Sequence, residues 1–156
     1  MRQIDGGGPP VELLKSPELY GVVSPSPDGR WIAHAAYQGG TLQVFVRSFP
    51  DIKGRWQVSH DGGSVPRWSA DGRTLFFGQD NDIFEVSVQR EPEVAFGEPR
   101  RLFRRRPVRG LPPGALPFDV SRDGQRFLVL SGEGEVSSDT SAFVVLNWSP
   151  DAEMRR

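Results

Sequence analysis

The phrase Ser26-Pro27-Asp28-Gly29-Arg30-Trp31-Ile32-Ala33 occurs, with small changes, three times in this chain of 156 residues. The second copy reads Ser69-Ala70-Asp71-Gly72-Arg73-Thr74-Leu75-Phe76, and the third reads Ser121-Arg122-Asp123-Gly124-Gln125-Arg126-Phe127-Leu128. The aspartates of successive copies are 43 and 52 residues apart. A repeat of this length with strand-like flanks indicates one four-stranded sheet per unit, as in the blades of a β-propeller.

Within each copy, the aspartate and the glycine predict a tight turn between two strands. Glycine adopts a positive φ without the steric penalty of a Cβ atom. Aspartate accepts hydrogen bonds from backbone amides just ahead of it, and the serine two residues earlier does the same more weakly. We therefore interpret six residues as structural turn formers: Asp28, Gly29, Asp71, Gly72, Asp123 and Gly124.

Runs of strand-forming residues separated by turn residues continue through each unit. The predicted strands cover residues 21–24, 31–36, 43–48 and 55–58 in the first unit, 65–68, 74–78, 83–88 and 98–103 in the second, and 116–120, 126–131 and 142–148 in the third. The predicted fold is an all-β, partial β-propeller of about three four-stranded antiparallel blades. In the first unit Pro25 stands where the others have Trp68 and Val120, which predicts a weakened or bent strand because proline donates no ladder hydrogen bond.

The predicted organisation is one domain made of successive blades. Residues 1–15 end a preceding blade, 16–60 form blade 1, 61–105 form blade 2, 106–149 form blade 3 with its connection, and 150–156 are a tail. Because the third unit lacks a fourth strand and a strand-like segment precedes the first, we expect the chain to start and end part-way through a blade. Two chains paired as a homodimer would then complete a six-bladed ring.

Composition excludes several classes of protein. The 18 glycines show no three-residue period, which excludes collagen, and a hydrophobic content of 37% argues against disorder. The absence of cysteine removes disulfides, thiolate metal sites and cysteine nucleophiles. No apolar run approaches the ~20 residues of a membrane span, and no apolar segment typical of a signal peptide follows Met1. The compartment stays unknown.

The repeat phrase and its lead-in at residues 66–69 resemble the WD40-like, PD40-type repeat of TolB-type propellers. The segments 44–50, 54–59, 118–128 and 144–148 are similar to the propeller at the C-terminus of bacterial serine/threonine protein kinases. Together the likeness extends from about residue 8 to residue 148. It implies a non-catalytic protein-interaction or sensor module with a protein partner. Kinase-linked relatives carry this propeller outside the cytoplasm, and other relatives are cytoplasmic.

The chain also departs from that family. It holds about three blades where such propellers commonly have six or more, and it contains none of the protein-kinase motifs. Two alternatives therefore stay open. The chain is either the C-terminal fragment of a kinase or propeller-peptidase polypeptide, without activity of its own, or a degenerate fragment. We predict no enzyme activity, no cofactor, and no catalytic or metal residue.

Two segments carry residue types that hydrolases and metal sites use. The segment at residues 62–66, Gly-Gly-Ser-Val-Pro, lacks the closing glycine of a nucleophile elbow. We therefore interpret Ser64, His60 and Asp61 as part of a turn rather than as a catalytic triad. Asp80-Asn81-Asp82 offers oxygen ligands for calcium, but its spacing fits no EF-hand, and we interpret it as a solvated hairpin turn.

The remaining histidine and a sequon have structural explanations as well. His34 occupies the repeat position of Phe77 and Val129, which predicts a packing role. The sequon at residues 147–149 falls in a predicted strand, where glycosylation is not expected.

The most polarised segment is a cluster of six arginines without an acid: Arg100, Arg101, Arg104, Arg105, Arg106 and Arg109. Such a cluster can bind the phosphate groups of nucleic acid or anionic lipid headgroups, and it is a candidate contact for an anion or a partner. It also fits an outer strand whose charges prevent edge-to-edge aggregation, which is the interpretation we favour. Because Phe103 is its only aromatic neighbour, nucleic-acid binding is not expected.

Overall fold

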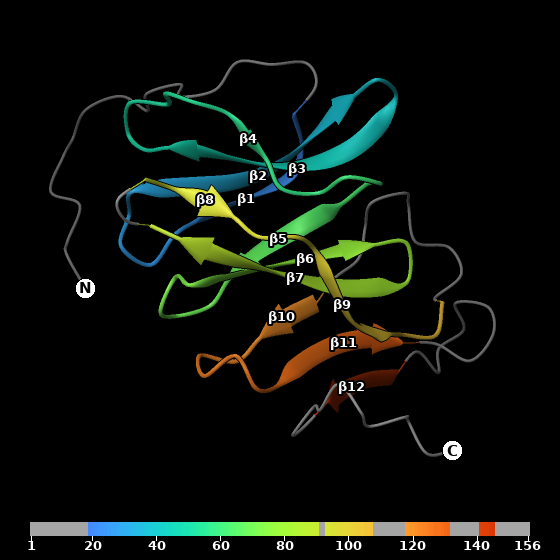
Figure 1. Cartoon of the computed structure of the whole chain (residues 1–156). Helices are drawn as coiled ribbons and strands as arrows, with labels where there is room; N and C mark the ends of the chain where they lie inside the picture. The colour runs from blue at the N-terminus through green and yellow to red at the C-terminus, as the bar shows by residue number, and fades with distance from the viewer. Residues whose placement is uncertain (1–18, 91–92, 108–117, 132–140, 146–156) are drawn as a thin grey trace, which may run out of the picture.

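The computed structural model describes residues 19–90, 93–107, 118–131 and 141–145. Every regular element in these ranges is a β-strand, and the strands form three antiparallel sheets that are stacked along the molecule (Figure 1). No helix in the described ranges is long and apolar enough to cross a membrane. The arrangement is a partial, unclosed β-propeller, which confirms the predicted fold class. The segments predicted at 1–15 and 150–156, together with Arg109 and the sequon at 147–149, lie outside the described residues.

Blade 1 contains four strands in sequence order. They are β1 (Leu19–Pro25), β2 (Trp31–Gln38), β3 (Thr41–Ser48) and β4 (Trp56–Gln57). Gly39 and Gly40 form the two-residue turn between β2 and β3, and both have a positive φ, of 59° and 82°. That backbone shape matches the twist of the two strands and favours glycine at both positions.

The irregularity of β1 lies before Pro25 rather than at it. Pro25 forms the last pair of the strand, opposite Ile32, whereas the register shifts between residues 20 and 24. Gly21, with a φ of 74°, lies within that stretch. The predicted bend at Pro25 is therefore displaced toward Gly21, because a proline at the end of a strand removes no interior ladder bond.

Blade 2 differs from the expected four strands because its outer position is shared by two short ones. Its strands are β5 (Ser64–Trp68), β6 (Thr74–Gln79), β7 (Asp82–Gln89), β8 (Ala95–Phe96) and β9 (Arg100–Arg104). One end of β7 pairs with β8 and the other with β9. The backbone amide of Gly97 donates to the carbonyl of Ser87 at 3.0 Å between the two pairings. A Cβ at Gly97 would lie 2.4 Å from the Ser87 hydroxyl, so glycine permits this close step.

Blade 3 contains three described strands, β10 (Phe118–Val120), β11 (Phe127–Ser131) and β12 (Ser141–Val145). The ends of the predicted strands at 116–117 and 146–148 lie outside the described residues. The predicted boundaries between the units stay predictions, although each sheet contains one copy of the repeat.

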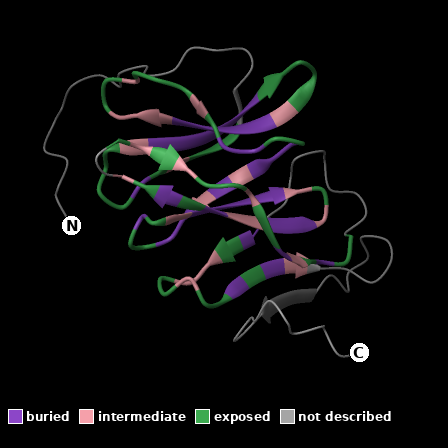
Figure 2. Ribbon diagram, in the orientation of Figure 1, coloured by how far each residue is buried: buried purple, intermediate pink, exposed green. Residues whose placement is uncertain are grey.

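The blades are joined by two apolar clusters, one at each junction (Figure 2). Between blades 1 and 2, Ala33, Val44 and Val46 pack against Leu75 and Phe77. Between blades 2 and 3, the Phe76 and Phe127 rings meet edge-to-face, with their centroids 5.3 Å apart. The strands β2, β3 and β6 are therefore buried on both faces, and burying one such side chain contributes about 2 kcal/mol.

Candidate functional site

The Asp-Gly turn of blade 2 is held by hydrogen bonds between residues that are close in sequence. The Ser69 hydroxyl donates to Asp71 Oδ1 at 2.7 Å and accepts from the Thr74 amide at 2.9 Å. Asp71 Oδ1 also accepts from the Arg73 amide at 3.0 Å. The Gly72 amide donates to the Ser69 carbonyl at 2.9 Å, with glycine at a φ of 66°. The side chains of the phrase therefore fix the turn that they form.

The other two blades repeat this bonding. In blade 1 the Ser26 hydroxyl donates to Asp28 Oδ1 at 2.6 Å and accepts from the Trp31 amide at 3.0 Å. In blade 3 the Ser121 hydroxyl donates to Asp123 and accepts from the Arg126 amide at 2.9 Å. All three turns connect the first and second strands of a blade, so we call the edge of the molecule that carries them the turn rim.

The three turn aspartates have pKa values below the ordinary value for that side chain. For Asp71 and Asp123, the serine hydroxyl and then the backbone amide stabilise the charged form and lower the pKa. For Asp28, partial burial raises the pKa, but hydrogen bonds from Ser26, from the Arg30 amide and from Arg90 outweigh it. The rim therefore carries three carboxylates that stay ionised at neutral pH.

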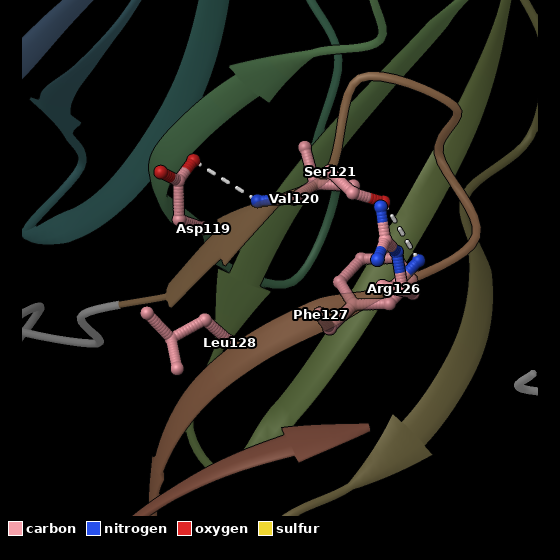
Figure 3. A pocket seen from close by; sticks show the side chains of 6 residues that line it. All are labelled: Asp119, Val120, Ser121, Arg126, Phe127 and Leu128. Atoms are coloured by element: carbon pink, nitrogen blue, oxygen red, sulfur yellow. Dashed lines mark hydrogen bonds between the residues drawn. The ribbon is translucent and has the colours of Figure 1, made fainter. Parts of the chain in front are cut away.

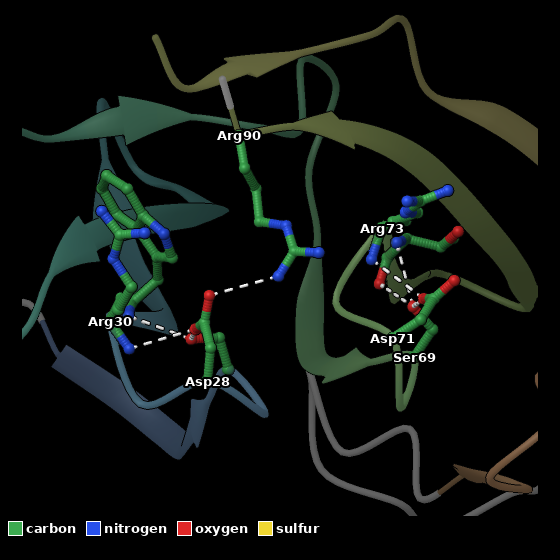
Figure 4. Close-up of polar contacts among 9 residues, drawn as sticks. Asp28, Arg30, Ser69, Asp71, Arg73 and Arg90 are labelled. Atoms are coloured by element: carbon green, nitrogen blue, oxygen red, sulfur yellow. Dashed lines mark hydrogen bonds and ion pairs between the residues drawn. The ribbon is translucent and has the colours of Figure 1, made fainter. Parts of the chain in front are cut away.

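Arg90, directly after β7, connects the turn of blade 1 to blade 2. Its Nη1 atom lies 3.2 Å from Asp28 Oδ2 (Figure 4). The same nitrogen lies so close to Gly72 that a Cβ there would be 3.3 Å away. The Arg90 guanidinium thus occupies the space between the turns of blades 1 and 2.

A hollow of about 460 Å³ surrounds this guanidinium, and we call it the arginine hollow. It is lined by Asp28, Arg30, Arg73, Val88, Gln89 and Arg90. Three arginines against one aspartate give it a formal charge of +2. Among the described residues, neither Arg30 nor Arg73 forms a side-chain ion pair, and both side chains are exposed. Two guanidinium groups are therefore presented to solvent on a fixed scaffold.

The corresponding hollow between blades 2 and 3 has the opposite charge. It encloses about 560 Å³, and its charged lining residues are Asp71, Glu85, Asp123 and Arg122. Three acids against one arginine give the lining a formal charge of −2, and Glu85 among them is also paired with Arg100. We call it the acidic hollow. The turn rim therefore changes from positive to negative between adjacent blade junctions.

The arginine cluster lies on and just after the outer strand β9, where acids of β7 neutralise part of it. Arg104 makes two hydrogen bonds to Asp82, both at 2.9 Å, and Arg101 lies 4.0 Å from the same carboxylate. Arg100 Nε donates to Glu85 at 2.8 Å. These pairs hold β9 against β7.

Arg105 and Arg106 follow the strand and differ from each other. Arg105 is buried and donates to the Leu130 carbonyl of β11 at 3.1 Å, so it joins blades 2 and 3. Burial lowers its pKa. Arg106 is exposed. The described arginines of the cluster thus take part in strand pairing and blade packing, and binding of an anion by the cluster stays a prediction.

The residues weighed as a catalytic triad have separate partners. Ser64 is buried, and its hydroxyl donates to the Gly78 carbonyl at 3.4 Å. His60 Nε2 lies 3.3 Å from Glu98, on the surface. The backbone carbonyl of Asp61 accepts a bond from Gln79. Within the described ranges, no hydrogen bond connects Ser64 to His60.

The Asp80-Asn81-Asp82 turn, considered as a calcium site, and His34 also have structural roles. Asp82 is engaged by Arg101 and Arg104 of β9, and no group of three potential metal ligands occurs in the described part of the chain. His34 is 2% exposed and stacks on Phe45, with the ring centroids 5.8 Å apart. Its repeat position predicted this packing.

Sequence reasoning missed the arginine hollow. Arg30 and Arg73 follow the turn glycines at equivalent repeat positions, which is a signal that both lie on one rim. Nothing in the sequence marked Arg90, because it is 62 residues from Asp28 and belongs to no copy of the phrase. Only the stacking of blades brings the three together.

Comparison with known proteins gives a fold and no family. No family model matches the chain, and no curated protein matches it. Among solved structures, TolB from Acinetobacter baumannii has a TM-score of 0.59 and 18% identity, over 83% of this chain and 30% of TolB. A candidate 6-phosphogluconolactonase from Bacteroides uniformis has a TM-score of 0.45 and 18% identity, over 70% of this chain and 32% of that one.

This chain therefore has a TolB-like propeller fold and spans about a third of the length of these two structures.

Proposed function

We propose that this chain is a non-catalytic protein-interaction or sensor module that binds a protein partner through its turn rim. The observation that carries the proposal is the rim itself, where three turns of identical construction enclose two hollows of opposite charge. Because internal hydrogen bonds fix each turn, the rim loses little conformational freedom when a partner binds. Complementary charge then supplies orientation and specificity.

Site-directed photo-crosslinking in extracts of the source organism tests this function. A photoreactive amino acid at Arg122, an exposed rim position, should give a discrete cross-linked protein that excess unlabelled chain removes by competition. The matched control is Thr41, an exposed residue at the turn between β2 and β3, on the opposite edge of the sheet. Equal products from both positions, or no product that competitor removes, would contradict the proposal.

The likeness to kinase-linked propellers supports a second proposal, in which this module belongs to a longer kinase or propeller-peptidase polypeptide. The chain would then contribute binding without activity of its own, on the outer side of the membrane in the kinase-linked case. The genomic sequence immediately upstream of the Met1 codon tests it. An open frame that continues into a kinase or hydrolase domain supports the proposal, and a stop codon with a ribosome-binding site contradicts it.

The degenerate-fragment alternative predicts a different solution behaviour. A chain that has lost its function through decay should lack a cooperative unfolding transition. The interaction module should instead unfold in one transition, because two shared clusters join its three blades. Urea denaturation followed by tryptophan fluorescence distinguishes the two.

A separate proposal concerns assembly: a further blade, from this polypeptide or from a second copy of the chain, docks on the flank of blade 3. Ala33 and Phe76 pack at the junction with the next blade, with exposures of 0% and 3%, whereas the equivalent Leu128 is 49% exposed. A hollow of about 250 Å³ lies beside it (Figure 3). This exposed apolar position supports docking of another blade, including one from a second chain.

A further inference from the structure

We propose that the arginine hollow is the site where the partner inserts an acidic peptide segment. This inference rests on the proposed interaction function and names the chemistry of the bound segment. Neither the arginine hollow nor Arg90 was marked by the sequence.

The arrangement of the three guanidinium groups carries the proposal. Arg90 is held in place by its ion pair with Asp28, while Arg30 and Arg73 flank it on the two neighbouring turns (Figure 4). The planar guanidinium offers paired donors that match the two oxygens of a carboxylate. A segment with two or more acidic side chains can therefore engage Arg30 and Arg73 together.

The repeat itself shows that this charge is specific to one junction. The position after the turn glycine is arginine in the first two copies, Arg30 and Arg73, but Gln125 in the third. Glutamine is thus compatible with the same turn. The backbone amide of Gln125 donates a hydrogen bond to Asp123, just as the backbone amide of Arg73 donates one to Asp71. The side-chain charge of Arg30 and Arg73 is not needed for the turn and is available for binding.

The surroundings favour an acidic peptide over a nucleic acid. The lining of the arginine hollow contains no aromatic side chain on which a base could stack. The acidic hollow follows at the next junction of the rim, where it would repel a continuous phosphate backbone. A peptide can place acids at one hollow and neutral or basic residues at the other.

Fluorescence anisotropy with the full-length chain tests the inference. The probe is an acetylated, fluorescein-labelled hexaglutamate peptide, and a labelled duplex DNA of ten base pairs is measured in parallel. The test variant combines Arg30→Gln with Arg73→Gln, the residue that the third repeat carries naturally. The matched control combines Arg101→Gln with Arg106→Gln, which removes two positive charges at β9 and beyond it instead.

We expect the chain to bind hexaglutamate and the test variant to bind it about tenfold more weakly, with the control close to the parent. Circular dichroism and an unchanged thermal midpoint show that the test variant is folded. Undiminished binding by the test variant, an equal loss in the control, or tighter binding of the DNA would overturn the inference. A cross-linked partner at Arg122 that survives Arg30→Gln and Arg73→Gln would leave the proposed function intact and remove only the assignment of this hollow.

Discussion

Ser69 shows how one hydroxyl fixes a propeller turn. It is 7% exposed, accepts a hydrogen bond from the Thr74 amide and donates one to Asp71. Its removal leaves the Thr74 amide without that acceptor. A buried donor without a partner costs about 1–3 kcal/mol.

Ser69→Ala should therefore lower the free energy of unfolding by about 1–2 kcal/mol, measured by urea denaturation. Ser121→Ala removes the same bonds from a more exposed turn, where water replaces them, and should cost less. Equal losses in the two variants would show that burial does not set the cost.

His34 is a buried titratable group among apolar and cationic neighbours. Burial lowers its pKa most strongly, and the positive charges of Arg47 and Arg55 lower it further. Neither ring nitrogen has a hydrogen-bond partner in the described ranges. The folded chain therefore binds a proton at His34 less readily than the unfolded chain does.

This difference predicts a pH dependence of stability. As pH falls below the ordinary histidine value of about 6.5, the unfolded state takes up the proton first, so the stability present at neutral pH is lost. His34→Phe, which copies Phe77, should flatten the dependence of the unfolding free energy on pH between about 7 and 5. His34→Gln should flatten it as well, while lowering stability at every pH. A slope that both variants retain would exclude His34 as its origin.

At the scale of elements, the outer strand β9 is held by ion pairs as well as by its ladder. Asp82, the first residue of β7, is 8% exposed and is engaged by Arg104 and Arg101. Both guanidinium groups point toward this acid rather than acting as free charges. Asp82 therefore offsets part of the positive charge of the arginine cluster.

Asp82→Asn should weaken the attachment of β9 and release positive charge. We expect the variant to elute from heparin at higher salt than the parent and to unfold at lower urea concentration. Asp80→Asn is the matched control, since it makes the same change of net charge in the adjoining turn. If both variants shift equally on heparin, net charge alone explains the effect.

The elements also show where local patterns suffice. The strands β2, β3, β6 and β7 lie within two residues of their predicted bounds, because a turn signal marks the start of each: Asp-Gly before β2 and β6, Gly-Gly before β3 and Asp80-Asn81 before β7. The division of the outer strand of blade 2 into β8 and β9 was missed. It depends on which end of β7 each segment reaches, and no local propensity encodes that choice.

At the scale of the whole molecule, the two flanks of the blade stack differ. Leu128 on blade 3 is half exposed, whereas His34 and Phe45 of blade 1 are buried. A further blade can dock on Leu128 directly. Closure of a six-bladed ring by two chains also requires contact with the flank of blade 1, where the Arg55 guanidinium lies 3.7 Å from the centroid of the Phe45 ring.

Leu128→Asp tests association through this flank. If two chains pair there, multi-angle light scattering should give the mass of two chains for the parent and of one chain for the variant, because an ionised carboxylate opposes burial. Leu128→Ile, which keeps the apolar surface, should remain paired. A parent that is monomeric at all concentrations would reject the homodimer.

The sequence by itself determined the all-β architecture and the construction of the turn rim. Each turn depends on residues within five positions of one another, such as Ser26 and Trp31 in the first copy. One short segment of sequence therefore contains every side chain that forms the turn. The three copies of the phrase then correspond to the three sheets of the described residues.

Tertiary structure alone decided how the blades meet. Trp68 bonds to Ser24 across 44 positions, Arg90 to Asp28 across 62, and the two hollows acquire opposite charge from residues of different blades. Such contacts exist only after the sheets have stacked. The physical reason is that turn formation is a local equilibrium of the backbone, whereas the charge of a junction is set by which distant side chains packing brings within reach of one another.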